Sequence, residues 1–338
     1  HTRIKHYFKK NPKHLHKSIK KCTFAVDKKS LAMTSHEKLK QLHNFTKIIQ
    51  WFACMFLLSI PAIGCATLFP QPLSVTSLKW IQFLQTTSIF LLPPLFMAYL
   101  WSERPLEWLR VKGERLKVKG EGIWAVVLML VALPAINLLG YLNQQMTLPT
   151  FLEPLEQWMK TSEENAKVLT EQFLNVTTFS GLIINLLLMA LLPAVAEELT
   201  FRGVLMNLFE LKGERLKVKD KRTHLAIWCS AILFSAIHLQ FYGFVPRMLM
   251  GALFGYILVW TGSLWIPILM HFTNNAMAVL LYFVAYRAGW NMEQVDAIGT
   301  NDTLWLGVVS MVLTIVGIYA FRRSTTMSNA SSRISSGN

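Results

Sequence analysis

Three short stretches of the sequence place ionisable side chains inside apolar runs. PAVAEELTFRG contains Glu197, Glu198 and Arg202, LFSAIHLQF contains His238, and PILMHFTNNAM contains His271. A charged side chain at the centre of a bilayer costs roughly 2.5 to 3.5 kcal/mol, so ionisable groups in such runs normally face a cavity or one another. These five residues are therefore candidates for a functional site.

Helical spacing groups the charges of the first stretch. Glu198 and Arg202 are four residues apart, so they share one helix face and can form an ion pair. Glu197 lies about 100° around the same helix from Glu198 and has no such local partner. The spacing predicts that Glu197 turns toward other elements, with the two histidines as its candidate partners.

The other two stretches also carry pairs one helical turn apart. Phe234 and His238 share a face, and Asn275 follows His271 by one turn. Taken singly, each residue has an ordinary structural interpretation: a lone helical histidine is usually a packing residue, and a lone asparagine often links helices in membranes. The coincidence of all these pairs in apolar helices favours a shared polar site.

The composition indicates where these helices lie. The chain is 53% hydrophobic and only 16% charged, which is too apolar for an ordinary soluble domain of 338 residues. The sequence therefore predicts an all-α polytopic membrane protein whose helices enclose an intramembrane polar cavity. Eight runs are long enough to cross about 30 Å of hydrocarbon. They are 48–69, 80–101, 122–142, 178–200, 225–241, 246–262, 264–286 and 304–321.

The basic residues follow the topology that these spans imply. The net charge is +15, and 28 of the 34 Lys and Arg fall in the segments on one side. The opposite loop 143–176 is acidic. Positive charge accumulates on the cytoplasmic side of membrane proteins, so both termini are predicted to be cytoplasmic, and nucleic acid is not a predicted partner. The basic segments are 1–47, 102–121, 203–223 and 322–338.

The predicted organisation has three parts. Residues 1–47 form a basic cytoplasmic arm, with Met33 as a candidate natural start. Residues 48–321 form the eight-span domain, and residues 322–338 form a polar cytoplasmic tail. No cleavable signal peptide is visible, because a long basic polar segment comes first.

Two further features are interpreted as inert. The octapeptide KGERLKVK occurs at 112–119 and again at 212–219, each time in a basic loop, and is interpreted as a repeated insertion in loops that tolerate lengthening. The four cysteines show neither metal-ligand spacing nor a disulfide framework. They are Cys22, Cys54, Cys65 and Cys229.

The order of the three motifs resembles a known family. EELTFR, FSAIH and HFTNN are similar to the glutamate pair with arginine, the Phe-x-x-x-His and the His-x-x-x-Asn of the CPBP intramembrane proteases. This family includes CAAX-processing, bacteriocin-processing and lysostaphin-resistance-protein-A-like members. The resemblance covers about residues 178–282, roughly a third of the chain. It implies an intramembrane endopeptidase that cleaves membrane-associated peptides or protein termini.

The resemblance implies roles for the site residues. In a metal-free mechanism, Glu197 and His238 hold and deprotonate a water, while His271 and Asn275 donate to the oxyanion. The Glu198–Arg202 ion pair positions Glu197, and Phe234 supports the histidine of its own motif.

A metal mechanism is the alternative. Here His238, His271 and Glu197 ligate Zn²⁺, whose bound water has its pKa lowered to about 7. The metal-free mechanism is favoured because the histidines come from separate helices and asparagine is an unusual zinc ligand. No cofactor other than zinc is indicated.

The site sets a geometric condition on the fourth span. If that span ended at residue 200, Glu197 would lie near the cytoplasmic surface while His238 lay some 20 Å deep at a 1.5 Å rise per residue. The apolar run continues as GVLMNLF, and Pro193 allows a kink. The sequence therefore predicts a helix that extends to about residue 209, which brings Glu197 within about 8 Å of the histidines.

The predicted cavity is built from the fourth, fifth and seventh spans and opens toward the cytoplasm or laterally into lipid. The predicted partners are the bilayer and a peptide or protein substrate, with lipidated substrates as one class, and the oligomeric state is left open. The predicted location is a bacterial cell membrane. Two other functions are compatible with buried polar helices: a non-proteolytic scaffold or immunity protein of the same family, and a proton- or solute-coupled transporter.

Overall fold

A computed structural model describes residues 39, 42–112, 118–209, 220–291, 294–295 and 297–335. Within these ranges the chain is built of helices joined by short connections, and no strand occurs. The predicted all-α fold class is confirmed. Most of the basic arm, residues 113–117 of the first KGERLKVK octapeptide, the whole of the second octapeptide and the end of the tail lie outside the described residues.

Seven helical segments of the described chain are long and apolar enough to cross a membrane, where the sequence predicts eight. The missing one is the fifth, predicted at 225–241. Its place is taken by α12 (Lys221–Ala236), which has only 16 residues. The seven are Asn44–Ala66, Val75–Trp101, Gly120–Gln144, Phe179–Phe209, Phe241–Thr261, Trp265–Ala288 and Asn301–Thr326.

Helix α12 ends early for a local reason. After Ala236 the chain turns through Leu239, which has a positive φ of 53°. Side chains other than glycine, asparagine and aspartate seldom adopt this conformation, and it cannot continue a right-handed helix. A short 3₁₀ turn, Phe241–Gly243, then leads into α13 (Phe244–Thr261). His238 consequently lies in a turn just beyond the end of α12.

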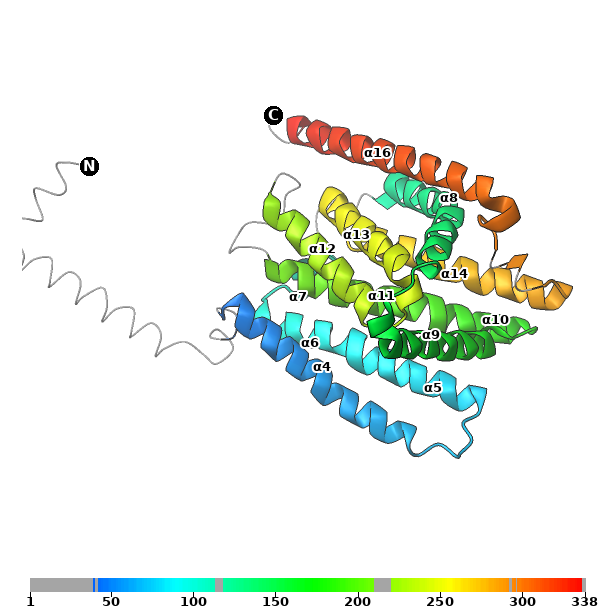
Figure 1. The fold of residues 1–338 in the computed structure, drawn as a ribbon. Helices are drawn as coiled ribbons and strands as arrows, with labels where there is room; N and C mark the ends of the chain where they lie inside the picture. The colour runs from blue at the N-terminus through cyan, green and yellow to red at the C-terminus, as the bar shows by residue number, and fades with distance from the viewer. Residues whose placement is uncertain are drawn as a thin grey trace, which may run out of the picture.

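The helices form a bundle in which the segment that carries the two glutamates is central (Figure 1). On one side lie α4 (Asn44–Ala66), α5 (Val75–Thr86) and α6 (Leu92–Trp101). The short α7 (Pro105–Trp108) follows α6 and lies in the basic loop.

On the opposite side of the bundle, α8 (Val118–Gln144) packs against α16 (Leu304–Ser335) (Figure 1). Helix α14 (Trp265–Ala288) also packs against α8 and contacts the central segment. Helices α12 and α13 pack closely against each other. Elements far apart in the sequence thus surround the segment that carries Glu197 and Glu198.

The central span runs from Phe179 to Phe209, as predicted, but it is not a regular α-helix. Helix α10 (Phe179–Asn185) is followed by a π turn (Leu186–Leu191), then by α11 (Leu192–Glu198). The first π turn ends two residues before Pro193, the residue at which the sequence allows a kink. A proline lacks the backbone N–H of an α-helical turn, and a wider turn is one way to accommodate it.

A second π turn, Leu199–Leu205, follows the glutamates and contains Arg202, and a 3₁₀ turn, Met206–Phe209, ends the span. Two hydroxyl groups link this turn to neighbouring helices: its own Thr200 Oγ1 donates to the Phe90 carbonyl, 2.8 Å, and Ser230 Oγ of α12 donates to the Phe201 carbonyl, 3.1 Å. π-Bulges are rare and concentrate at functional sites. Two of them flank the helix turn that carries Glu197.

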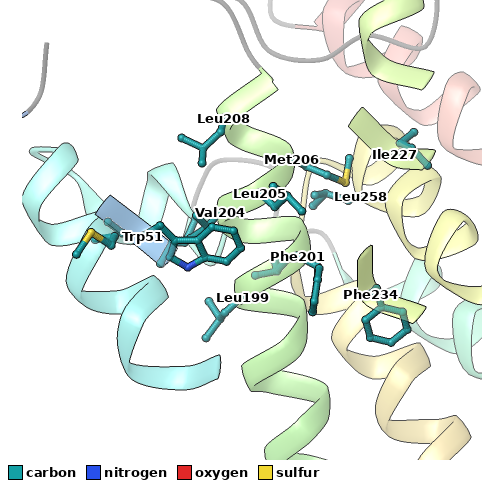
Figure 2. Close-up of a cluster of buried hydrophobic side chains, with 14 of the residues drawn as sticks. Trp51, Leu199, Phe201, Val204, Leu205, Met206, Leu208, Ile227, Phe234 and Leu258 are labelled. Atoms are coloured by element: carbon teal, nitrogen blue, oxygen red, sulfur yellow. The ribbon is translucent and has the colours of Figure 1, made fainter. Parts of the chain in front are cut away.

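The main hydrophobic core surrounds residues 199–209, the C-terminal end of this span (Figure 2). Trp51 of α4 lies on one side of residues 199–209, while Ile227 of α12 and Leu258 of α13 lie on the other. All three side chains are at most 2% exposed. At roughly 1.5 to 3 kcal/mol for each large apolar side chain that is fully buried, this packing fixes the span on which the glutamates sit.

The acidic loop between the third and fourth spans contains an amphipathic helix, α9 (Glu153–Leu174). Glu156 accepts hydrogen bonds from Lys160 Nζ, 2.8 Å, and from the Leu148 N–H, 3.1 Å. These bonds hold the pKa of Glu156 below its ordinary value, the Lys160 bond most of all. Farther along, Ser162 Oγ donates to the Leu239 carbonyl, 2.9 Å, so α9 packs against the turn that follows His238.

Candidate active site

Glu197 faces both histidines of the two later motifs. Its Oε2 lies 3.8 Å from His271 Nε2 and 4.0 Å from His238 Nε2. The three side chains are 13%, 7% and 27% exposed, respectively. These separations are longer than a direct hydrogen bond. The fold thus brings together the three residues that the sequence proposed as partners, within the 8 Å limit set above.

The bond at the other nitrogen of His238 fixes its tautomer. Nδ1 lies 2.8 Å from the Phe234 carbonyl, one turn earlier in the chain. A carbonyl oxygen can only accept, so Nδ1 carries the hydrogen, and Nε2 of the neutral ring presents a lone pair toward Glu197.

Glu198 joins two motifs through one oxygen atom. Its Oε1 accepts from Arg202 Nη1 at 2.8 Å and from His271 Nδ1 at 3.0 Å. Both members of the Glu198–Arg202 pair are fully buried. The bond to Glu198 orients the His271 ring and directs its Nε2 at Glu197. The sequence predicted the pair with Arg202, but it gave no signal for the bond to His271.

Arg202 is held on several sides. Its Nη2 donates to the Gly251 carbonyl, 2.8 Å, and its guanidinium carbon lies 4.6 Å from the centre of the Phe234 ring. A cation over an aromatic face is attracted by the ring quadrupole. Gly251 allows the close approach, because a Cβ at this position would lie 3.1 Å from Nη2 and 3.2 Å from the Ala231 Cα.

Phe234 links the charged pair to the histidines. Its ring packs edge-on against His238 and His271, with centroids 5.2 Å and 5.8 Å apart, and the residue is 2% exposed. On its other side His271 stacks on Phe254, 5.6 Å between centroids. The aromatic rings fill the space around the polar groups and limit the access of water to them.

Asn275 is placed less closely than the other predicted residues. It lies one helical turn beyond His271 on α14, and its Oδ1 accepts from Asn274 Nδ2, 3.0 Å. This bond leaves the Asn275 amide nitrogen as a donor. Its role as an oxyanion donor is a prediction that rests on the motif.

The polar cluster does not have the geometry of a metal site. Within the described ranges, no group of three or more His, Cys, Asp and Glu side chains could hold a metal ion. Zinc ligands at about 2.0 to 2.1 Å in a tetrahedron lie roughly 3.4 Å apart, whereas Glu197 and the two histidines are 3.8 and 4.0 Å apart. The donor types suit zinc, but their spacing is wider than a tetrahedral zinc site requires.

A cavity of about 780 Å³ adjoins the cluster. It is lined by α8, α9, α13 and α14 together with Gln240, Gly243 and residues from 295 to 301. The fourth, fifth and seventh predicted spans supply Glu197, His238 and His271 themselves, and the catalytic cavity predicted between these spans stays a prediction. Among the lining residues, Gln240 follows His238 by two positions and Asn274 precedes Asn275. The cavity therefore lies beside the candidate catalytic groups.

The cavity also lies at the end of the helices opposite the basic loops. It is lined by the last part of α8, by α9 and by the turn before α13, whereas the basic segments adjoin the other ends of these spans. If the basic loops are cytoplasmic, the cavity faces the other side of the membrane. The sequence predicts an opening toward the cytoplasm or laterally into lipid, and with this topology only the lateral opening would suit this cavity.

Arg247 is a residue at the site that the sequence analysis missed. It lies in the first turns of α13 and lines the cavity. Its guanidinium interacts electrostatically with Glu197 and His238. One signal was available: Arg247, like Arg202, is a cation within an apolar run.

Comparison with known proteins gives two matches. Residues 179–277 match the model of the family described as type II CAAX prenyl endopeptidase Rce1-like. The chain is also 29% identical over 118 residues to the uncharacterized protein YpbD of Bacillus subtilis. This aligned stretch covers 33% of this chain and 54% of YpbD. The match thus spans about half the length of that relative. No solved structure matches the chain.

The matched segment contains all seven predicted site residues. The family comparison therefore confirms the resemblance stated from the three motifs. It covers less than a third of the chain and does not extend to α4, α5, α8 or α9.

Proposed function

We propose, from the similarity of residues 179–277 to the Rce1-like endopeptidases, that this protein is an intramembrane endopeptidase with Glu197 as its base. The observation that carries the proposal is the position of Glu197 Oε2 opposite the Nε2 atoms of His238 and His271. The substrates are terminal or leader segments of membrane-associated peptides and proteins. The bilayer of a bacterial cell membrane is the proposed location.

Glu197 and His238 activate the water in this mechanism. Glu197 Oε2 and His238 Nε2 are 4.0 Å apart, too far for a direct hydrogen bond, and a water bonded to both atoms can bridge them. The carboxylate of Glu197 and the Nε2 lone pair of His238 each accept one of its hydrogens, which directs the oxygen lone pairs at the scissile carbonyl. As the oxygen attacks the carbonyl carbon, Glu197 takes the proton and later transfers it to the leaving amine.

His271 and Asn275 stabilise the oxyanion. Because Nδ1–H of His271 is bound to Glu198, Nε2 is a donor only when the ring is protonated. In this mechanism the His271 ring carries both protons while it stabilises the oxyanion. The amide nitrogen of Asn275 supplies the second donor. The buried charges of Glu198 and Arg202 hold this arrangement without reorganisation during the reaction.

Glu197→Gln tests the proposal, with Glu164→Gln, on the exposed face of α9, as the matched control. Purified wild type and variants in liposomes are incubated with quenched fluorescent peptides, half with a prenylated cysteine near the C-terminus and half without. We expect wild type and Glu164→Gln to cleave a subset of the peptides and Glu197→Gln to lose at least about 100-fold in rate, the order of general-base catalysis. The prenylated and plain sets show whether lipidated substrates are used.

The same variants are tested in cells for any phenotype that deletion of the gene produces. If Glu197→Gln cleaves nothing but still returns the deletion strain to the wild-type phenotype, the protein is a scaffold or immunity protein and the endopeptidase proposal fails. If cleavage persists in Glu197→Gln, the base is another residue.

A further inference from the structure

The turn that carries His238 is not supported by its own helix. Helix α12 ends at Ala236, and the chain then turns through Leu239. Main-chain groups that a continued helix would pair internally need other partners in such a turn. The bond from Nδ1 to the Phe234 carbonyl orients the His238 ring. The position of its backbone depends on what holds residues 239–243.

Helix α9 supplies partners to two main-chain groups of this turn. Ser162 Oγ donates to the Leu239 carbonyl at 2.9 Å, and the Tyr242 N–H donates to Glu163 Oε2 at 3.3 Å. Both α9 side chains are half-buried. The first bond is made at the residue that directly follows His238. Two adjacent residues of α9 thus hold both ends of a four-residue stretch of the turn.

Two other side chains hold the part of the turn farther from His238. The ring of Trp158, also on α9, packs against the ring of Phe241 with 5.2 Å between centroids. At the end of α8, Asn143 is buried; its Nδ2 donates to the Phe241 carbonyl, 3.1 Å, and its Oδ1 accepts from the Val245 N–H, 2.8 Å. Asn143 therefore fixes the start of α13, while Ser162 fixes the turn next to His238.

We propose that Ser162 and Glu163 are positioning residues that hold His238 within reach of Glu197. This inference rests on the proposed endopeptidase function, because the two residues act on the reaction through His238. Nε2 of His238 and Oε2 of Glu197 are 4.0 Å apart and share one water in the proposed mechanism. A misplacement of about 1 Å can cost on the order of 100-fold in rate. A loosened turn therefore slows the chemical step.

Both positioning residues lie outside the segment that matches the family model, residues 179–277. The motif that contains His238 is thus held by a helix of the preceding acidic loop. A role of α9 in general stability is the alternative, and it predicts a different result: the loss would spread over the whole bundle and would not be specific to the chemical step.

The test removes each bond and then restores it. Ser162→Ala removes the donor to Leu239, and Ser162→Thr keeps a hydroxyl. Glu163→Ala removes the acceptor, and Glu163→Gln keeps an amide oxygen that accepts. Thr161→Ala is the matched control, since Thr161 is exposed and its Oγ1 donates to the Gln157 carbonyl of α9 itself, 2.9 Å.

Hydrogen–deuterium exchange in liposomes is the first measurement, and it needs no substrate. We expect the amides of residues 239–243 to exchange about 2- to 10-fold faster in Ser162→Ala and Glu163→Ala, the order of one hydrogen bond. Exchange in the rest of α13 should stay as in wild type. Thr161→Ala, Ser162→Thr and Glu163→Gln should match wild type throughout.

Steady-state cleavage of the quenched peptides is the second measurement. We expect kcat to fall about 2- to 10-fold in each alanine variant with KM unchanged, because the lost bond acts only on the reacting groups. Ser162→Thr and Glu163→Gln should restore kcat. Thr161→Ala should retain the wild-type kcat.

The outcomes separate this inference from the proposed function. If exchange in the turn is unchanged, or kcat keeps its wild-type value although exchange is faster, the inference is wrong. If exchange rises across the whole bundle, or if Ser162→Thr and Glu163→Gln lose as much activity as the alanine variants, α9 has only a structural role and the inference is wrong. If wild type cleaves no peptide, the proposed function fails and the positioning role fails with it, whatever the exchange shows.

Discussion

Glu198 and His271 are 73 residues apart in the chain and are joined by a 3.0 Å hydrogen bond between Oε1 and Nδ1. The same oxygen binds Arg202 at 2.8 Å. A change at Glu198 therefore acts in two ways: it removes the counter-ion of a fully buried arginine, and it releases the ring that faces Glu197. The adjacent Glu197 makes neither of these two bonds and instead faces His271 Nε2 at 3.8 Å. The two neighbours should respond differently to the same substitution.

Glu198→Gln is expected to destabilise the protein, whereas Glu197→Gln is not. Removal of one partner from a buried ion pair leaves an uncompensated charge and costs about 3 to 5 kcal/mol. Thermal unfolding in detergent measures the difference. We expect a fall of many degrees in Tm for Glu198→Gln and a Tm close to that of wild type for Glu197→Gln. Equal Tm values for the two variants would contradict the division of roles between the glutamates.

The local relationships of this site could be read from the sequence. The pairing of Glu198 with Arg202 follows from a spacing of four residues, and the path of the fourth span to Phe209 follows from the apolar run beyond Arg202. These features depend on one helix each. Periodicity and length are sufficient to predict them.

Other relationships depend on how helices pack, and the sequence holds no signal for them. The Glu198–His271 bond requires α14 to lie against the central span in one rotation. The length of α12 is set by the turn at Leu239, in a run that is apolar enough to resemble a full span. The inward position of Arg247 depends on Gln240 and Gly243, which bring no recognisable motif.

Gly251→Ala is expected to disturb the site through packing alone. The added Cβ would lie 3.1 Å from Arg202 Nη2 and 3.2 Å from the backbone of Ala231, so it cannot be accommodated without movement of Arg202 or of α12. Overpacking of this kind costs typically 1 to 3 kcal/mol. The expected result is a lower Tm and a lower rate of peptide cleavage.

Gly64→Ala is the control for that change. Gly64 is also in a helix, α4, and a Cβ there would have nothing within 4 Å. Because alanine favours a helix over glycine by up to about 1 kcal/mol, Tm should stay the same or rise. If both variants lose stability equally, the close packing of Gly251 against Arg202 is not the cause.

Removal of metal is expected to leave activity unchanged. The spacing of Glu197, His238 and His271 is wider than a tetrahedral zinc site requires, and the mechanism uses Glu197 as the base without a metal. Elemental analysis of the purified protein should find far less than one zinc per chain. Peptide cleavage should survive prolonged treatment with a strong chelator. Stoichiometric zinc that is lost together with activity, and restored with it, would establish the metal mechanism instead.

The position of the cavity leads to a prediction about sidedness. The cavity and α9 lie at the helix ends opposite the basic loops, and the positive-inside rule places those loops in the cytoplasm. In a background with the four native cysteines replaced by serine, single cysteines are introduced at Glu164 on α9 and at Lys221 at the start of α12, both exposed. A membrane-impermeant maleimide added to intact cells should label Glu164→Cys at once. It should label Lys221→Cys only after permeabilisation. The reverse pattern would place the cavity on the cytoplasmic side.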